Sequence, residues 1–124
     1  MIKKRKLNRT YQQFLEGSIK EVFHLLCPVR EKEWLQGWDY RMVYSESGYA
    51  EKGCVFETSN IYGNFNWIIT KHDIDTFEIQ FVKISNGKIV VIIDIALTEY
   101  NKKSTICNIH YTYIALDNHI IDQM

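Results

Sequence analysis

Few side chains in this sequence stand in a pattern that could do chemistry. His72, Asp73 and Asp75 lie close together, but they fall where a strand is expected to end, and His-Asp-x-Asp is a common turn sequence there. Glu57 lies in an apolar strand pattern that lets its side chain point either inward or outward. A buried carboxylate would have a raised pKa and could serve as an acid or a base. We favour turn formation for the His-Asp cluster and an exposed position for Glu57.

The cysteine and histidine spacings argue against a metal site. The three cysteines, Cys27, Cys54 and Cys107, include no Cys-x-x-Cys pair, and no two of the four histidines have ligand spacing on one element. Widely spaced cysteines of odd number also argue against a disulfide framework, so we expect reduced, mostly buried thiols in a cytoplasmic protein. We therefore expect no metal and no cofactor, and the sequence identifies no catalytic residue.

A stronger pattern is an apolar, aromatic face in the second half of the chain. Aromatic residues make up 14% of the sequence, and beyond residue 64 they recur with the period of two that marks a half-buried strand. Such a face could line a ligand pocket, with tyrosine hydroxyls as its few polar groups, or could be a plain core. The residues predicted to line a cavity are Trp38, Phe65, Trp67, Ile69, Phe77, Ile79, Phe81, Tyr111 and Tyr113. Trp34, Trp38 and Asp39 could shape the cavity entrance, but we favour a packing role at the joint between helix and sheet.

The elements that must position these residues are one strand, two short helices and then about six antiparallel strands. Ser18 opens the capping-box pattern Ser-x-x-Glu, so a first helix is expected from there until Pro28 ends it. Residues 29–35 predict a second short helix. Asn86-Gly87 predicts a two-residue type I′ hairpin. The predicted strands are 6–15, 40–46, 53–59, 64–72, 76–84, 88–99 and 104–115.

Length and composition predict a single α+β domain over residues 1–124. Hydrophobic residues make up 46% of the chain and charged residues 24%, as in ordinary globular proteins. The formal net charge of zero argues against a dedicated nucleic-acid binder, which must neutralise phosphates. No run approaches the ~20 apolar residues that a membrane span needs.

Several short motifs resemble those of the SRPBCC superfamily, which includes START lipid-binding domains, Bet v 1-like proteins and polyketide cyclases. They are LCPVRE at residues 26–31, EWL at 33–35, GWD at 37–39 and EKGCVF at 51–56. This set is similar to one branch of uncharacterised bacterial and archaeal members. Those members often have a proline immediately before the glycine, where this chain has Gln36.

The resemblance implies a helix-grip fold, in which a curved seven-stranded antiparallel sheet wraps a long C-terminal helix around an apolar cavity. Here only residues 117–124 follow the last predicted strand, so we expect that helix to be absent. A large apolar face is rarely left exposed to solvent. We therefore predict a homodimer in which the second subunit covers the concave face of the sheet. The alternative is a truncated domain of poor stability.

The expected function is therefore binding of a small apolar or amphipathic ligand in a cavity on the concave face. A cyclase- or aromatase-like enzyme is one alternative, since such a cavity can orient a flexible substrate while polar groups move protons. The other is a protein-interaction or self-assembly domain that uses the open face. A polar group with a shifted pKa deep in the cavity would favour the enzyme, and a smooth apolar cavity would favour binding.

Overall fold

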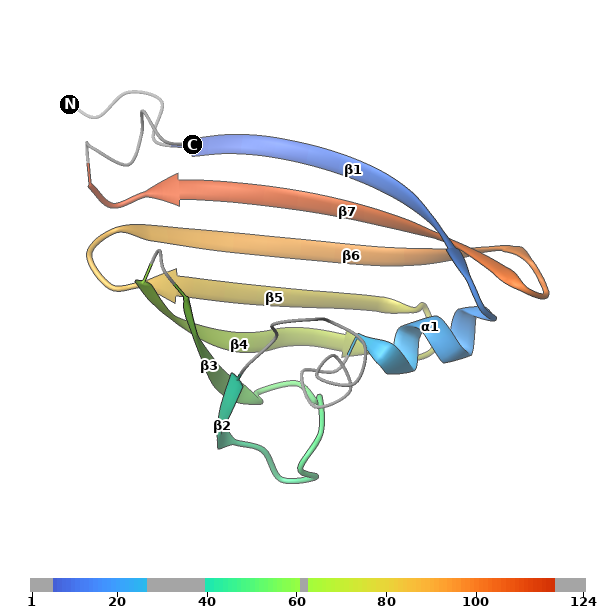
Figure 1. Cartoon of the computed structure of the whole chain (residues 1–124), viewed down its shortest axis with the longest axis horizontal. Helices are drawn as coiled ribbons and strands as arrows, with labels where there is room; N and C mark the ends of the chain where they lie inside the picture. The colour runs from blue at the N-terminus through green and yellow to red at the C-terminus, as the bar shows by residue number, and fades with distance from the viewer. Residues whose placement is uncertain (1–5, 27–39, 61–62, 118–124) are drawn as a thin grey trace.

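A computed structural model describes residues 6–26, 40–60 and 63–117 of the chain. Its framework is one seven-stranded antiparallel sheet with the strand order β1-β7-β6-β5-β4-β3-β2 (Figure 1). The elements in chain order are β1 (Lys6–Glu16), α1 (Ile19–Leu25), β2 (Tyr40–Tyr44), β3 (Val55–Asn60), β4 (Gly63–Asp73), β5 (Glu78–Ser85), β6 (Ile89–Asn101) and β7 (Ser104–Ala115). The predicted seven-stranded antiparallel sheet, with a short helix after the first strand, is confirmed.

Successive strands from β2 to β7 pair with one another as a meander, and β1 pairs with the last strand. The β1–β7 pairing extends along the whole of β1, from Lys6 opposite Ile114 to Glu16 opposite Ser104. Strands far apart in the sequence therefore lie side by side at one edge of the sheet, while β2 forms the other edge (Figure 1).

The helix α1 begins at the predicted cap. The Ser18 hydroxyl accepts a hydrogen bond from the backbone N–H of Glu21 at 3.3 Å, which satisfies one of the free donors of the first turn. Val22 and Phe23 are buried against the sheet, and the helix ends where Leu26 N–H donates to the Phe23 carbonyl at 3.2 Å. No helix in the described part of the chain is long and apolar enough to cross a membrane.

Some predictions fall on parts of the chain that lie outside the described residues. These include the second helix at 29–35, the residues Trp34, Trp38 and Asp39, and Cys27. After β7 the described chain continues only to Asp117, and it contains no C-terminal helix.

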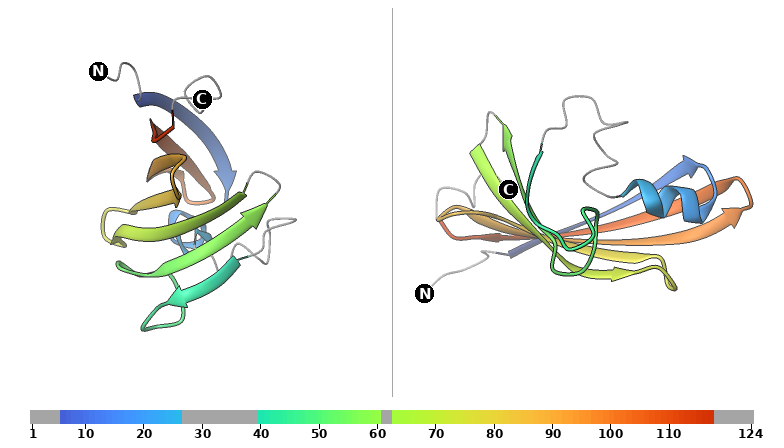
Figure 2. Two further views of the ribbon diagram at one scale, coloured as in Figure 1. Left: turned by 90° about the vertical axis from the view of Figure 1, so that its left-hand side faces the viewer. Right: turned by 90° about the horizontal axis from the view of Figure 1, so that it is seen from below.

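The sheet is bent, and one of its faces is concave. Register shifts interrupt the β2–β3, β4–β5 and β6–β7 pairings at Met42/Tyr44, Ile69/Lys71 and Glu99/Asn101, and such bulges increase the local bend and twist. Figure 2 shows β2, β3 and α1 on the same side of the curved sheet. The buried core lies on this side and comprises Val22, Phe23, Cys54, Phe56, Ile69, Ile79, Phe81, Val91, Ile93, Leu97 and Cys107.

The predicted type I′ hairpin between β5 and β6 is wrong in its detail. Ser85 pairs with Ile89, which leaves three residues in the loop, and Lys88 N–H donates to the Ser85 carbonyl at 2.9 Å. Gly87 has φ +73°, whereas Asn86 has no positive φ. The hydrogen bond closes the turn Ser85–Lys88, and Gly87 is its third residue, the one position where a type II turn needs a positive φ, so a single glycine meets the requirement.

The structure also corrects the position of Phe77, which was expected inside a strand. The strand β5 begins one residue later, and Phe77 has the left-handed φ of 57° in the β4–β5 turn. The turn is fixed by the Asp73 carboxylate, which accepts hydrogen bonds from the N–H groups of Asp75 at 2.9 Å and Thr76 at 3.2 Å. Turn formation at the His-Asp cluster is thereby confirmed, but the turn extends further along the chain than expected.

Candidate ligand-binding site on the concave face

The strand register brings most of the predicted lining residues to the concave face. Side chains directly opposite each other on paired strands point to the same face of a sheet, and Ile69 lies opposite Phe81 while Ile93 lies opposite Tyr111. The predicted residues on this face are Phe65, Trp67, Ile69, Ile79, Phe81, Tyr111 and Tyr113. Phe77 packs edge-on against Phe23 of α1, at 5.8 Å between ring centroids, so it lies at the helix end of the face. The assignment of these residues to a ligand site remains a prediction.

An aromatic floor, defined as Phe56, Trp67 and Phe81, occupies one half of the concave face. The Phe56 and Trp67 rings stack at 5.3 Å, and Phe81 meets both rings edge-on at 6.5 and 5.9 Å. Trp67 Nε1 donates a hydrogen bond to Thr58 Oγ1 at 2.9 Å, so the indole is fixed in orientation and its donor is satisfied. Phe56 is 1% exposed, whereas the Trp67 side chain is half-buried, which leaves part of the floor accessible.

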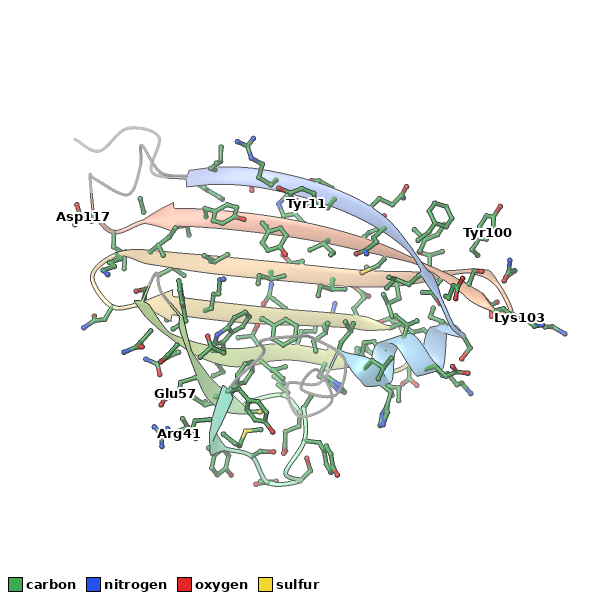
Figure 3. The ribbon with its side chains drawn as sticks, viewed as in Figure 1. Tyr11, Arg41, Glu57, Tyr100, Lys103 and Asp117 are labelled. Carbon is green, nitrogen blue, oxygen red and sulfur yellow. The ribbon has the colours of Figure 1, made fainter. Side chains whose placement is uncertain are left out.

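A tyrosine cluster, defined as Tyr11, Tyr111 and Tyr113, occupies the other half, near β1. Tyr111 and Tyr113 stack at 5.8 Å, and Tyr11 meets Tyr111 edge-on at 5.6 Å. Figure 3 shows Tyr11 extending from β1. Burial raises the pKa of Tyr111, and the neighbouring Tyr113 raises it further. The Tyr111 and Tyr113 phenols, whose pKa values are both raised by burial, therefore stay neutral at ordinary pH and can donate hydrogen bonds to a bound molecule.

Lys83 places a positive charge within this apolar surface, and the sequence analysis did not identify it. Its Nζ lies 4.7 Å from the centroid of the Phe65 ring and 4.9 Å from that of Trp67. Burial lowers the pKa of Lys83. The signal was present in the alternation of Ile79, Phe81 and Lys83 along β5, because the pattern that places the first two inward also places the lysine inward.

A pocket of about 520 Å³ opens at the helix end of the concave face, between α1, the β2–β3 loop and the end of β4. The His72 ring lies 5.1 Å from that of Phe23, and burial lowers the pKa of His72, which favours its neutral form. The β2–β3 loop is fixed by Glu51, whose Oε1 accepts hydrogen bonds from Ser45 Oγ at 2.6 Å and from Ser47 N at 2.7 Å. The residues lining the pocket are Lys20, Phe23, His24, Ser47, Tyr49, Ala50, His72 and Ile74.

Glu57, the carboxylate whose direction the sequence left open, points away from the concave face. Arg41 Nε donates to Glu57 Oε1 at 2.6 Å, and this hydrogen bond lowers the pKa of the carboxyl group. Figure 3 shows the pair at the outer edge formed by β2 and β3. Glu57 is half-exposed on the outward side and its pKa is lowered, so it is not the buried carboxyl group of raised pKa that acid-base work would need.

The described residues contain no group of three or more His, Cys, Asp or Glu side chains that could hold a metal ion. Cys54 and Cys107 are buried thiols that take part in no disulfide, and burial raises the pKa of Cys107. A buried thiol with a raised pKa is unreactive at neutral pH, so Cys107 serves as part of the core.

Comparison with known proteins shows the class of fold. No protein-family model and no curated protein sequence matches the chain. Among solved structures, norcoclaurine synthase from Thalictrum flavum matches with a TM-score of 0.68 and 11% identity, over 94% of this chain and 75% of that one. A major latex-like protein from Panax ginseng matches with a TM-score of 0.70 and 11% identity, over 93% and 83%. A hypothetical protein from Helicobacter pylori matches with a TM-score of 0.67 and 8% identity, over 89% and 71%.

The protein has the Bet v 1-like fold, as its motifs predicted. At these sequence identities the matches establish the fold and leave the activity of the chain open.

Proposed function

We propose that this protein binds a small apolar or amphipathic molecule on the concave face of its sheet. The observation that carries the proposal is that the aromatic floor and the tyrosine cluster are partly accessible. Trp67, Tyr111 and Tyr113 are half-buried, and their side chains point to the same side of the sheet. Small-molecule sites are mostly apolar with a few placed polar groups. The tyrosine hydroxyls and Lys83 supply such groups here.

One relative supports an aromatic ligand in particular. Norcoclaurine synthase, which shares the fold, has been solved in complex with dopamine and hydroxybenzaldehyde. Flat rings stack well on aromatic side chains, and Trp67 and Tyr111 both offer part of a ring to the concave side.

The cyclase-like alternative has weaker support than binding. General acid-base chemistry needs a positioned group whose pKa lies near the working pH. Glu57 points outward with a lowered pKa, while burial raises the pKa of Tyr111 and Tyr113 from ordinary values that are already high. Burial lowers the pKa of Lys83 and of His72, and these are the groups that the enzyme alternative would use. The rest of the described face offers hydrogen-bond donors and apolar surface, which suit binding.

A second copy of the chain is our proposed cover for the open part of the face. Tyr11 keeps 52% of its surface exposed at the β1 edge of the tyrosine cluster, and burying such rings in a symmetric interface is favourable. The homodimer stays a prediction, and it competes with a free small molecule for the same surface.

Native mass spectrometry of the purified chain tests both proposals, because it reads the number of subunits and any bound small molecule together. Titration with N-phenyl-1-naphthylamine, a neutral fluorescent amphipathic probe, then measures affinity. We expect Tyr111→Ala to weaken probe binding several-fold, while Tyr100→Ala, which removes an exposed ring beyond the face, leaves it unchanged. A wild-type chain that carries no adduct and binds no probe would refute the binding proposal, and a bare monomer would refute the homodimer.

A further inference from the structure

The charged side chains of the sheet are distributed unequally between its two faces. In the register of paired strands, Lys83 lies opposite Val91, and Arg9 lies opposite Tyr111, so both cations belong to the concave face. The acidic residue in the same register, Glu99, lies at the far end of β6 with an exposed side chain. Near the centre of the described concave face, the charged side chain is therefore a cation in apolar surroundings, and the acidic Glu99 lies away from it.

Carboxylates in the neighbouring strands are turned away from Lys83 and already have partners. Asp94 accepts a hydrogen bond from Gln80 at 2.7 Å on the opposite face, and Glu57 pairs with Arg41 at the outer edge. Among the described residues, Lys83 Nζ forms no hydrogen bond or ion pair, and it lies over the rings of Phe65 and Trp67. An ammonium group withdrawn from water without an anionic or hydrogen-bonding partner is costly, so this site is complementary to an added anion.

The row of residues across the strands from Lys83 shows what kind of anion fits. Trp67 lies opposite Lys83 on one side, and on the other side the row continues through Val91 to Tyr113. Neighbouring strands are about 4.8 Å apart, so Lys83 and Tyr113 stand roughly 10 Å apart across the sheet. Val91 itself is buried, so an anionic head at Lys83 would leave an apolar body to contact the half-buried rings of Trp67 and Tyr113, with the Tyr113 hydroxyl available at its far end.

We propose that the ligand of the concave face is an amphipathic organic anion, whose carboxylate pairs with the Lys83 ammonium while its apolar body extends along the face toward the half-buried Tyr113 ring. The proposal rests on the binding function proposed above and specifies the class of ligand. Lys83 thus selects for charge, whereas the rings supply affinity without regard to charge. A cationic ligand of the same shape is disfavoured, because Lys83, the charged group near the centre of the face, is positive.

A matched pair of probes separates these two contributions. The probes are 2-naphthoate and 2-naphthylmethanol, which share one bicyclic ring and differ in charge, and their binding is measured by isothermal titration calorimetry at neutral pH. We expect wild-type protein to bind the carboxylate about tenfold more tightly than the alcohol, as one well-placed charge-assisted contact would give. In Lys83→Met this ratio should fall to about one. The control Lys71→Met removes a positive charge from the opposite face, where Lys71 pairs with Glu78 at 3.0 Å, and should keep the wild-type ratio.

Two results would overturn the proposal while leaving the binding function intact: wild-type protein that binds both probes equally, or a Lys83→Met variant that keeps the preference for the carboxylate. Binding of neither probe would overturn both proposals together. Lys83→Gln serves as a second variant, with folding checked by circular dichroism, so that the outcome does not depend on one substitution.

Discussion

Replacing Lys83 by methionine should stabilise the ligand-free protein, because the lysine holds a charge in an apolar setting. The folded environment lowers the pKa of Lys83 through burial, so folding disfavours its charged form. Methionine keeps an apolar stem of similar length and adds a thioether that packs well against aromatic rings. The same substitution is expected to abolish the preference for anions, so stability and ligand selection should change in opposite directions.

The magnitude follows from two opposing contributions. The contacts of Nζ with the Phe65 and Trp67 rings, at 4.7 and 4.9 Å, are each worth about 0.5–1 kcal/mol at a partly exposed site. Withdrawing an ammonium group from water costs several kcal/mol when burial is complete, and Lys83 is half-buried. The difference favours methionine by about 1 kcal/mol. With an unfolding slope of about 2 kcal/mol per molar urea, the midpoint should rise by about 0.5 M.

The lowered pKa of Lys83 also determines how the stability difference between wild type and Lys83→Met changes with pH. Because the folded pKa of Lys83 lies below the value of 10.5 for an ordinary lysine, the unfolded chain binds more protons between the two values. As pH rises through this window, the free energy of unfolding of the wild type therefore increases relative to that of Lys83→Met. The advantage of Lys83→Met, measured by urea unfolding, should be smaller at pH 10 than at pH 7. Lys71→Met, which loses only an exposed ion pair, is the control. A Lys83→Met variant that unfolds at lower urea than wild type at pH 7 would show that the ring contacts outweigh desolvation, and the reasoning would fail.

Three further predictions concern the elements that hold the site. Phe56→Ala should lower the free energy of unfolding by about 3–5 kcal/mol in urea, because it empties a fully buried ring site beneath Trp67, and a loss below 1 kcal/mol would contradict the packing described for the floor. Ser18→Ala should cost about 1 kcal/mol through loss of the α1 cap, and Ser18→Asp should restore most of it. Burial lowers the pKa of His72, so stability should fall as pH drops below about 6.5 through the lowered pKa. Thermal melts of His72→Gln at pH 7.5 and 5.5 should show a smaller loss than wild type, and an equal loss would assign the pH dependence to other groups.

The sequence predicted the sheet well because its signal is local. Alternation of apolar and polar residues marks each strand, and a strand that buries one face tolerates no shift of register by one residue. The alternation through Ile79 and Phe81 also fixed which side chains share a face. The hairpin at Gly87 was harder to predict, because the number of loop residues depends on which residues of β5 and β6 pair. Phe77 was misplaced for a similar reason, since a carboxylate four residues earlier extends the turn.

The site was predicted less completely than the fold, because it depends on contacts between segments distant in sequence. The pocket beneath α1 brings His24 and His72 to its lining, although no motif joins them. Phe56 belongs to the aromatic floor only because β3 pairs with β4, which sets it opposite Trp67. Such neighbours become apparent only once the strand order and register are known.

Lys83 shows how a violation of the folding pattern can indicate function. The inward positions of β5 are Ile79, Phe81, Lys83 and Ser85, so an apolar run is broken by a cation where a leucine or a valine would pack well. Natural sequences keep their local rules consistent with the fold and break them where function requires it. A lysine at the edge of the face could reach water with its charged end. Lys83 instead lies on β5, the central strand of the seven, between the rings of Phe65 and Trp67 and the row that leads to Tyr113. The position of Lys83 therefore has two consequences: it lowers the stability of the ligand-free protein, and it makes the face complementary to an anionic ligand. Measuring stability and ligand preference in the same Lys83→Met variant tests whether this position is selected for binding.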